Sequence, residues 1–187
     1  MKSLANLAQQ PAGEPLLADE ILELHAARLV LLISICGVKK KNTGIIRLDG
    51  LTKLAKLDFL TRYPNFYEKL AKHLGKAKKA SIRDIESSMV RFHYGPWDDR
   101  YYHILSYLEA RGLIVVDKDA NTFRFGLTES GSTIASQLAQ EEAFGDLTAH
   151  IKQVKMLVGR FSGTKLKEKI YEVFGQEVVE RKLGESI

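Results

Sequence analysis

The sequence has few cysteines and no long apolar run. Its single cysteine, Cys36, excludes an internal disulfide, and we interpret it as a buried core thiol in a reducing cytoplasm. The longest apolar stretch, residues 29–38, is interrupted by Ser34 and is far shorter than the roughly 20 residues that span a bilayer. The N-terminus has one early lysine followed by polar residues, which does not match a signal peptide. We therefore expect a soluble cytoplasmic protein that does not bind membranes.

Motifs of enzymatic chemistry are also missing. Residues 159–165 superficially resemble a phosphate-binding loop, but only three residues, and not four, separate their glycines, and Thr164 precedes Lys165, which is the wrong order. The five histidines fit no zinc-ligand spacing, and Asp98 and Asp99 are explained by the start of a helix. We predict that the protein is not an enzyme and has no catalytic residues, cofactor or metal site.

The composition is that of a folded chain with a modest positive charge. Of the 187 residues, 45% are hydrophobic and 27% are charged, enough for one sizeable core or two very small ones. The formal net charge is +5, from 28 basic and 23 acidic residues. Such a charge permits contact with nucleic acid or with an acidic protein but requires neither.

The first half of the chain shows mainly helical periodicity. Apolar residues at steps of three and four predict a helix over 17–37, and the same spacing predicts a helix over 51–62 and another that begins at Pro64. A basic turn over 39–44 and a short β-prone segment over 45–48 separate the first two helices.

The second half has the pattern of a winged helix. Gly95-Pro96 predicts a turn, and Asp98 is suited to cap the helix that follows. The predicted order is then a helix that ends at Gly112, a strand over 113–116, a polar turn over 117–121, a strand over 122–127 and a helix capped by Thr128. We predict a mainly α (α+β) fold, with a winged helix-turn-helix core, a small β-hairpin wing and flanking helices.

The predicted organisation has four parts. They are a flexible N-terminal tail over 1–15, an N-terminal helical part with a basic block over 16–80, the winged-helix core over 81–140, and C-terminal helices over 141–187.

Charge is distributed unevenly over these parts. Residues 98–111 carry two basic and three acidic residues, and the predicted wing is neutral, whereas residues 39–83 carry thirteen basic and three acidic residues. A block of this kind is usually a solvated face; contact with the nucleic-acid backbone is the next explanation, and docking on an acidic partner is the third. The candidate nucleic-acid-binding residues are Lys39, Lys40, Lys41, Lys53, Lys56, Lys76, Lys78 and Lys79.

Several motifs are similar to those of a known family. The segments are RLDGLTKLAKLDFL at 47–60, RYP at 62–64, YGPWD at 94–98, LEARGL at 108–113, LTESG at 127–131 and LKEKIYE at 166–172. In this order they resemble the small middle components of bacterial three-component defence systems of the Lamassu type. In those systems the middle protein accompanies an SMC-like or Rad50-like ATPase and a toxic effector, often a nuclease.

This resemblance implies an adaptor that bridges the ATPase and effector subunits in anti-phage or anti-plasmid defence, with non-specific DNA contact through the complex. The candidate partner-binding residues are Tyr94, Trp97, Tyr102 and Tyr107, although Trp97 is equally suited to fill the core. The alternative is a dimeric winged-helix transcription regulator. A regulator should prefer one DNA sequence and lose that preference when Arg100 or Arg124 is replaced by alanine.

Overall fold

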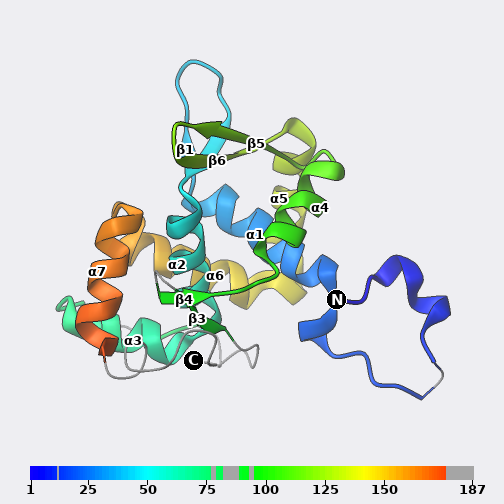
Figure 1. Ribbon diagram of the computed structural model, residues 1–187, viewed down its shortest axis with the longest axis horizontal. Coiled ribbons are helices and arrows are strands. Elements are labelled where there is room, and N and C mark those ends of the chain that lie inside the picture. Colours follow the sequence, from blue (N-terminus) through cyan, green and yellow to red (C-terminus); the bar gives the residue numbers. More distant parts are fainter. Residues whose placement is uncertain (12, 77–78, 82–88, 93–94, 176–187) are drawn as a thin grey trace.

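A computed structural model describes residues 1–187 except 12, 77–78, 82–88, 93–94 and 176–187. The described part is mainly helical, with a small antiparallel sheet (Figure 1). The helices are α1 (Leu22–Cys36), α2 (Leu51–Arg62), α3 (Pro64–His73), α4 (Tyr101–Ala110), α5 (Glu129–Gln140), α6 (Gly145–Val158) and α7 (Gly163–Phe174). The strands are β1 (Val38–Lys39), β2 (Ile46–Asp49), β3 (Val90–Phe92), β4 (Gly95–Trp97), β5 (Ile114–Asp119) and β6 (Thr122–Leu127). Short 3-10 turns cover Leu4–Gln9, Ala18–Glu20 and Glu142–Phe144.

Helix α1 is the centre of the core. Its apolar residues point to several sides, and Leu29, Leu31 and Ile33 are completely buried. It contacts α2, α4, α5 and α6 as well as β2 and β6. A helix that is apolar on most of its faces is expected to be surrounded by other elements. The predicted helix over 17–37 is therefore present, but it begins at Leu22, after a 3-10 turn.

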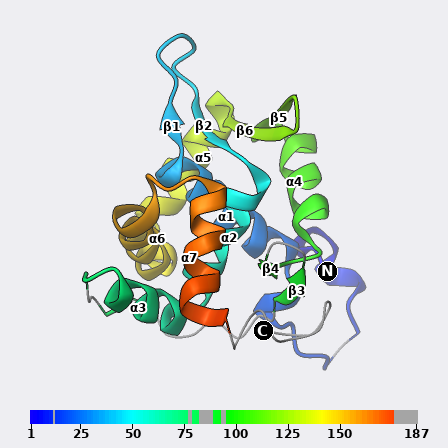
Figure 2. The same cartoon turned by 60° about the vertical axis from the view of Figure 1, so that its left-hand side comes forward.

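The four-stranded sheet joins the two halves of the chain. Its strand order is β1-β2-β6-β5, and every pair is antiparallel. Leu48 of β2 lies opposite Phe125 of β6, and Phe125 lies opposite Val116 of β5. In Figures 1 and 2 the sheet lies at one end of the helical body, and the β1–β2 hairpin projects beyond it. The core is thus shared by residues assigned to the 16–80 and 81–140 parts.

Local signals in the sequence predicted several boundaries correctly. Helix α2 spans the predicted residues and α3 begins at Pro64. The Thr128 hydroxyl accepts a hydrogen bond from the Gly131 amide at 2.9 Å, which confirms the predicted cap of α5. Gly112 ends α4 with a φ of 66°, a conformation that glycine adopts readily.

The predictions near α4 are confirmed only in part. Gly95-Pro96 belongs to strand β4, which pairs with β3, and is not a turn. Asp98 does cap the start of α4, since its carboxylate accepts a hydrogen bond from the Arg100 backbone amide at 2.9 Å. Its side chain is also buried and bonded to the guanidinium groups of Arg62 and Arg100, which was not predicted. The wing turn is also shorter than predicted, since β5 continues to Asp119 and only Ala120 and Asn121 separate it from β6.

Gly131 marks a close contact between α5 and the end of α4. A Cβ at this position would lie 1.8 Å from the carbonyl oxygen of Leu113, whereas a Cβ at Gly145 would meet nothing within 4 Å. Because the backbone must shift to relieve such a clash, we expect Gly131→Ala to destabilise the protein by about 1–3 kcal/mol. Gly145→Ala, the matched control, should change the unfolding free energy by less than about 0.5 kcal/mol. Urea denaturation measures the unfolding free energy of both variants. Equal losses in the two variants would contradict the close approach of Gly131 to the Leu113 carbonyl.

Candidate functional site

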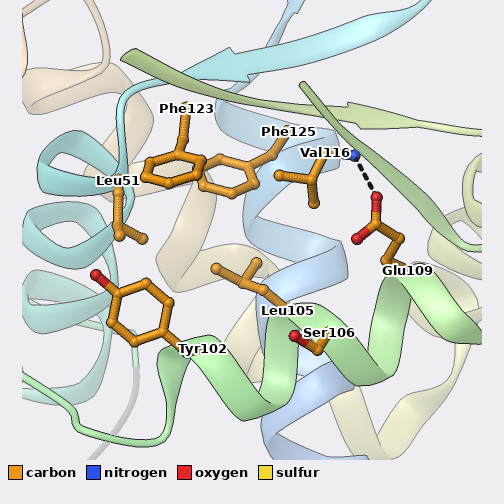
Figure 3. Close-up of a pocket in the computed structure, with 8 residues that line it drawn as sticks. All are labelled: Leu51, Tyr102, Leu105, Ser106, Glu109, Val116, Phe123 and Phe125. Atoms are coloured by element: carbon orange, nitrogen blue, oxygen red, sulfur yellow. Dashed lines mark hydrogen bonds between the residues drawn. The ribbon is translucent and has the colours of Figure 1, made fainter. Parts of the chain in front are cut away.

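An apolar groove runs along α4 and beneath the β5–β6 hairpin (Figure 3). Its volume is about 130 Å³. The lining residues come from α2, α4, β5 and β6, and they are Leu51, Tyr102, Leu105, Ser106, Glu109, Val116, Phe123 and Phe125.

The spacing of residues in each element explains why they meet in the groove. In α4, Tyr102, Leu105 and Glu109 are three and four residues apart and so share one face of the helix. In β6, Phe123 and Phe125 alternate onto the same face of the sheet, with ring centroids 6.5 Å apart and ring planes at 14°. One side of the groove is thereby helical and the other is aromatic sheet surface.

The outer part of the groove is open to solvent. Tyr102 is 59% exposed, and its ring centroid lies 6.0 Å from that of the half-buried Trp97. Trp97 also packs edge to face on the buried Tyr101, at 5.2 Å. Two of the predicted partner-binding aromatics, Trp97 and Tyr102, are therefore neighbours on one surface. An exposed aromatic beside an apolar hollow is typical of a protein-interaction surface.

Of the other two predicted aromatics, only Tyr107 is among the described residues, and it is not part of this surface. Tyr107 does not line the groove, and the guanidinium of Arg111 lies over its ring at 6.0 Å. Tyr94 lies outside the described residues.

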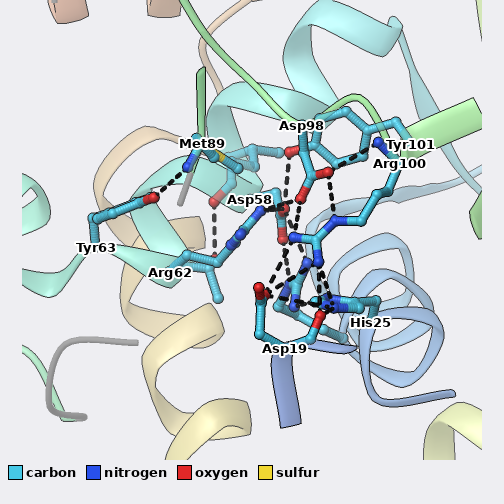
Figure 4. Close-up of polar contacts among 12 residues, drawn as sticks. Asp19, His25, Asp58, Arg62, Tyr63, Met89, Asp98, Arg100 and Tyr101 are labelled. Atoms are coloured by element: carbon cyan, nitrogen blue, oxygen red, sulfur yellow. Dashed lines mark hydrogen bonds and ion pairs between the residues drawn. The ribbon is translucent and has the colours of Figure 1, made fainter. Parts of the chain in front are cut away.

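A buried network of charges fixes the start of α4 (Figure 4). Asp58 of α2 accepts a hydrogen bond from Arg28 Nε of α1 at 2.7 Å and another from the Tyr101 hydroxyl at 2.8 Å. Asp58 is completely buried, and its carboxylate also lies 3.7 Å from Arg62 Nη1. The first residue of α4 is thus tied to both central helices.

The second half of the network is centred on Asp98. Its carboxylate accepts hydrogen bonds from Arg62 Nη1 at 2.6 Å and from Arg100 Nη2 at 2.8 Å. Arg100 also bonds Asp19, at 3.2 Å, and so ties the segment before α1 to the segment before α4. Burial alone would raise the pKa of Asp98, but the hydrogen bonds from Arg100 and the charge of Arg62 hold it well below its usual value.

The network is electrically balanced. The charges of Arg28, Arg62 and Arg100 are matched by three aspartates, at positions 19, 58 and 98. His25 lies among them, and burial together with the charge of Arg28 lowers its pKa, which favours the neutral ring. Burial likewise raises the pKa of Tyr101 far above its usual value, so its hydroxyl remains a donor. The network positions α4 and its groove relative to α1 and α2.

The predicted nucleic-acid-binding lysines that the structure describes differ in their exposure and pairing. Lys39, Lys41, Lys76 and Lys79 are exposed. Lys40 forms an ion pair with Asp49 at 3.0 Å, and Lys53 Nζ donates a hydrogen bond to the Gly159 carbonyl at 2.9 Å. Lys78 lies outside the described residues.

Lys56 requires a correction, because its side chain is completely buried and not on a surface that phosphate groups can reach. Burial, together with the nearby charge of Lys167, lowers the pKa of its ammonium to about 7. Lys56 was a candidate because it is one of the basic residues of the 39–83 block, but α2 is buried on nearly every side from Leu54 to Arg62.

A second hollow, the basic cleft, was not predicted. It lies between the end of α1 and the α6–α7 connection, has a volume of about 550 Å³, and is lined by Cys36, Gly37, Val38, Lys76, Lys155, Met156, Leu157, Gly159, Arg160 and Phe161. The prediction confined the basic surface to residues 39–83 and so left out Lys155 and Arg160. Cys36 is one of the lining residues and is buried. Burial raises the pKa of its thiol to about 12, in keeping with its interpretation as a core residue.

Comparisons with known proteins identify no relative. No protein-family model, no curated protein and no solved structure matches the chain. Within the described residues, no helix is long and apolar enough to cross a membrane. The same residues contain no group of three or more histidine, cysteine, aspartate or glutamate side chains arranged to hold a metal ion.

Proposed function

We propose that the chain is a non-enzymatic accessory subunit, built on a winged helix, that bridges an SMC-like ATPase and an effector in a bacterial defence complex. The motifs at 47–60, 94–98 and 127–131, which resemble those of Lamassu-type middle components, suggest the complex. The groove along α4 supports the role of a protein contact.

The order of elements supports a winged helix. α1, β2, α2, α4, β5 and β6 follow one another as helix, strand, helix, helix, strand and strand, and the strands lie side by side in the order β2-β6-β5. In this assignment α4 corresponds to the helix that DNA-binding winged-helix proteins place in the major groove, and the β5–β6 hairpin is the wing. Residues 63–100, with α3 and the β3–β4 pair, are then an insertion between the second and third helices.

The observation that carries the proposal is the apolar character of the α4 face. A DNA reader needs basic side chains there to meet phosphates. Here Arg100 is held by Asp98 and Asp19, and Arg124 of the wing is paired with acidic residues at 117 and 119 of its own hairpin. Because both arginines are already paired, they are not available for DNA phosphates. The exposed Tyr102 and the adjacent groove instead favour binding of an apolar segment of another protein.

The test is purification of the tagged full-length protein from its native host, with identification of the co-purifying proteins. The wild type should retain a large coiled-coil ATPase and a third subunit in a fixed ratio. Tyr102→Glu should lose at least one of them, because a charge at the groove must be desolvated on binding. Val115→Glu is the matched control, since Val115 is 55% exposed and alternates with the groove residue Val116 on β5.

Either of two outcomes would contradict the proposal. One is equal retention of the partners by the Tyr102 and Val115 variants. The other is recovery of the protein only as a homodimer that prefers one DNA sequence and loses this preference with Arg124→Ala, which would establish the transcription regulator instead.

A further inference from the structure

We propose that the basic cleft binds single-stranded nucleic acid. The isolated chain carries every residue that this contact requires, so the inference goes beyond the accessory-subunit role and does not depend on the ATPase or the effector. The cleft lies between the end of α1 and the connection from α6 to α7.

The cleft carries uncompensated positive charge. Lys76, Lys155 and Arg160 line it, and no acidic residue does. Among the described residues, none of these three cations forms an ion pair, whereas Lys40 and Arg47 are both paired with Asp49. Like charges held together without counter-ions repel one another and attract an anionic ligand.

The positive charge continues beyond the cleft. Val38 lines the cleft and begins the projecting β1–β2 hairpin, on which Lys39 and Lys41 are exposed (Figures 1 and 2). The cations in the cleft, with further exposed cations on the hairpin beside it, suit a polymer with a negative charge on every unit. An acidic peptide would need acidic residues placed to match the cations of the cleft.

The floor of the cleft distinguishes a single strand from a duplex. Val38 is 61% exposed and Met156 is 64% exposed, and the half-buried Phe161 lies beside them with Lys165 Nζ 4.7 Å above its ring. A duplex keeps its bases paired and offers a backbone of phosphate and sugar to such a floor. A single strand offers phosphates to the cations and unstacked bases to the apolar side chains.

The cleft and the α4 groove are on different sides of the molecule. In Figures 1 and 2, α7 and the end of α6 that leads to it lie to one side and α4 to the other. Nucleic acid in the cleft would therefore leave the groove free for a protein partner.

The experiment measures binding of the full-length chain to a fluorescently labelled 15-nucleotide oligothymidylate across a salt series. The double variant Lys155→Ala/Arg160→Ala should flatten the slope of log K against log salt by about 1.4, or roughly 0.7 for each lost phosphate contact. The control removes two exposed cations that do not line the cleft, Arg111→Ala/Lys118→Ala, and should leave the slope unchanged. Unchanged thermal midpoints would show that both double variants are folded.

A second pair of variants tests the apolar floor. Met156→Ser should weaken oligothymidylate binding about fivefold without changing the salt slope, because it removes apolar contact and no charge. Val115→Ser, which alters an equally exposed apolar residue on β5, should have no effect.

Three results would overturn the proposal. The first is absence of binding, or an equal change of slope in the two double variants. The second is equally tight binding of a 15-base-pair duplex that Met156→Ser does not weaken, which would indicate backbone contact alone. The third is displacement of the oligothymidylate by polyglutamate of equal charge at lower concentration, which would assign the cleft to an acidic polypeptide.

Discussion

Replacing Asp58 with asparagine should lower the free energy of unfolding by about 3–5 kcal/mol, because it leaves the buried Arg28 without its counter-ion. Asp58 is completely buried and bonds Arg28 and Tyr101, with Arg62 at 3.7 Å. The asparagine has nearly the same shape, so the loss would report charge and hydrogen bonding and not a cavity. Urea denaturation at neutral pH measures it.

The control for this prediction is an ion pair at the surface. Asp117 pairs with Arg124, and its side chain is 61% exposed. Asp117→Asn should cost less than about 1 kcal/mol, since water already screens that pair. If Asp58→Asn were equally mild, the network of α1, α2 and α4 would not be what holds α4 in place.

The second large effect is a dependence of stability on pH that comes from Lys56. Its pKa is about 7 in the folded protein, whereas the ordinary pKa of a lysine is 10.5, so the unfolded chain binds more protons between these limits. Stability should therefore rise with pH above 7, by up to about 1.4 kcal/mol per unit. At pH 7 and below, the buried ammonium costs the folded state as much as about 5 kcal/mol.

Lys56→Met tests this directly. Between pH 7 and 8.5 the wild type should gain about 2 kcal/mol, and the variant should be more stable at pH 7 and lack this gain. The window stays below pH 9, where Cys36 begins to ionise in the unfolded chain. Lys118→Met, at an exposed position, should keep the wild-type slope. If the unfolding free energy of Lys56→Met rose with pH as steeply as that of the wild type, the buried ammonium would not be the source of the pH dependence.

Local chemistry in the sequence was sufficient to predict many element boundaries. Pro64 begins α3, Thr128 caps α5 and Gly112 ends α4, because each depends on a backbone preference of one residue or on a bond to a near neighbour. The β5–β6 hairpin was predicted for the same reason, since its strands are adjacent in sequence.

Features that depend on distant residues were not predicted. The pairing of Leu48 with Phe125 joins strands more than 70 residues apart, and no periodicity specifies that choice. Asp58 was interpreted only as an acidic residue within a helix, because its partners come from positions 28 and 101.

The candidate sites show the same limit. Tyr102 and Trp97 were recognised as partner-binding candidates because they are aromatic residues in a short segment around α4. The floor of their groove was missed, because it is made by Phe123 and Leu51, which reach α4 only through the sheet and the start of α2. Likewise, Lys155 joins Lys76 in the basic cleft only because α6 packs against α1.

The most direct test of the central claim, that the α4 groove binds a protein, is photo-crosslinking in the native host. A benzophenone amino acid is placed at position 102 in one strain and at position 115 in another. We expect position 102, and not position 115, to crosslink to a subunit of a coiled-coil ATPase complex. Crosslinking of position 102 to DNA, to a second copy of this chain, or to nothing would contradict the account.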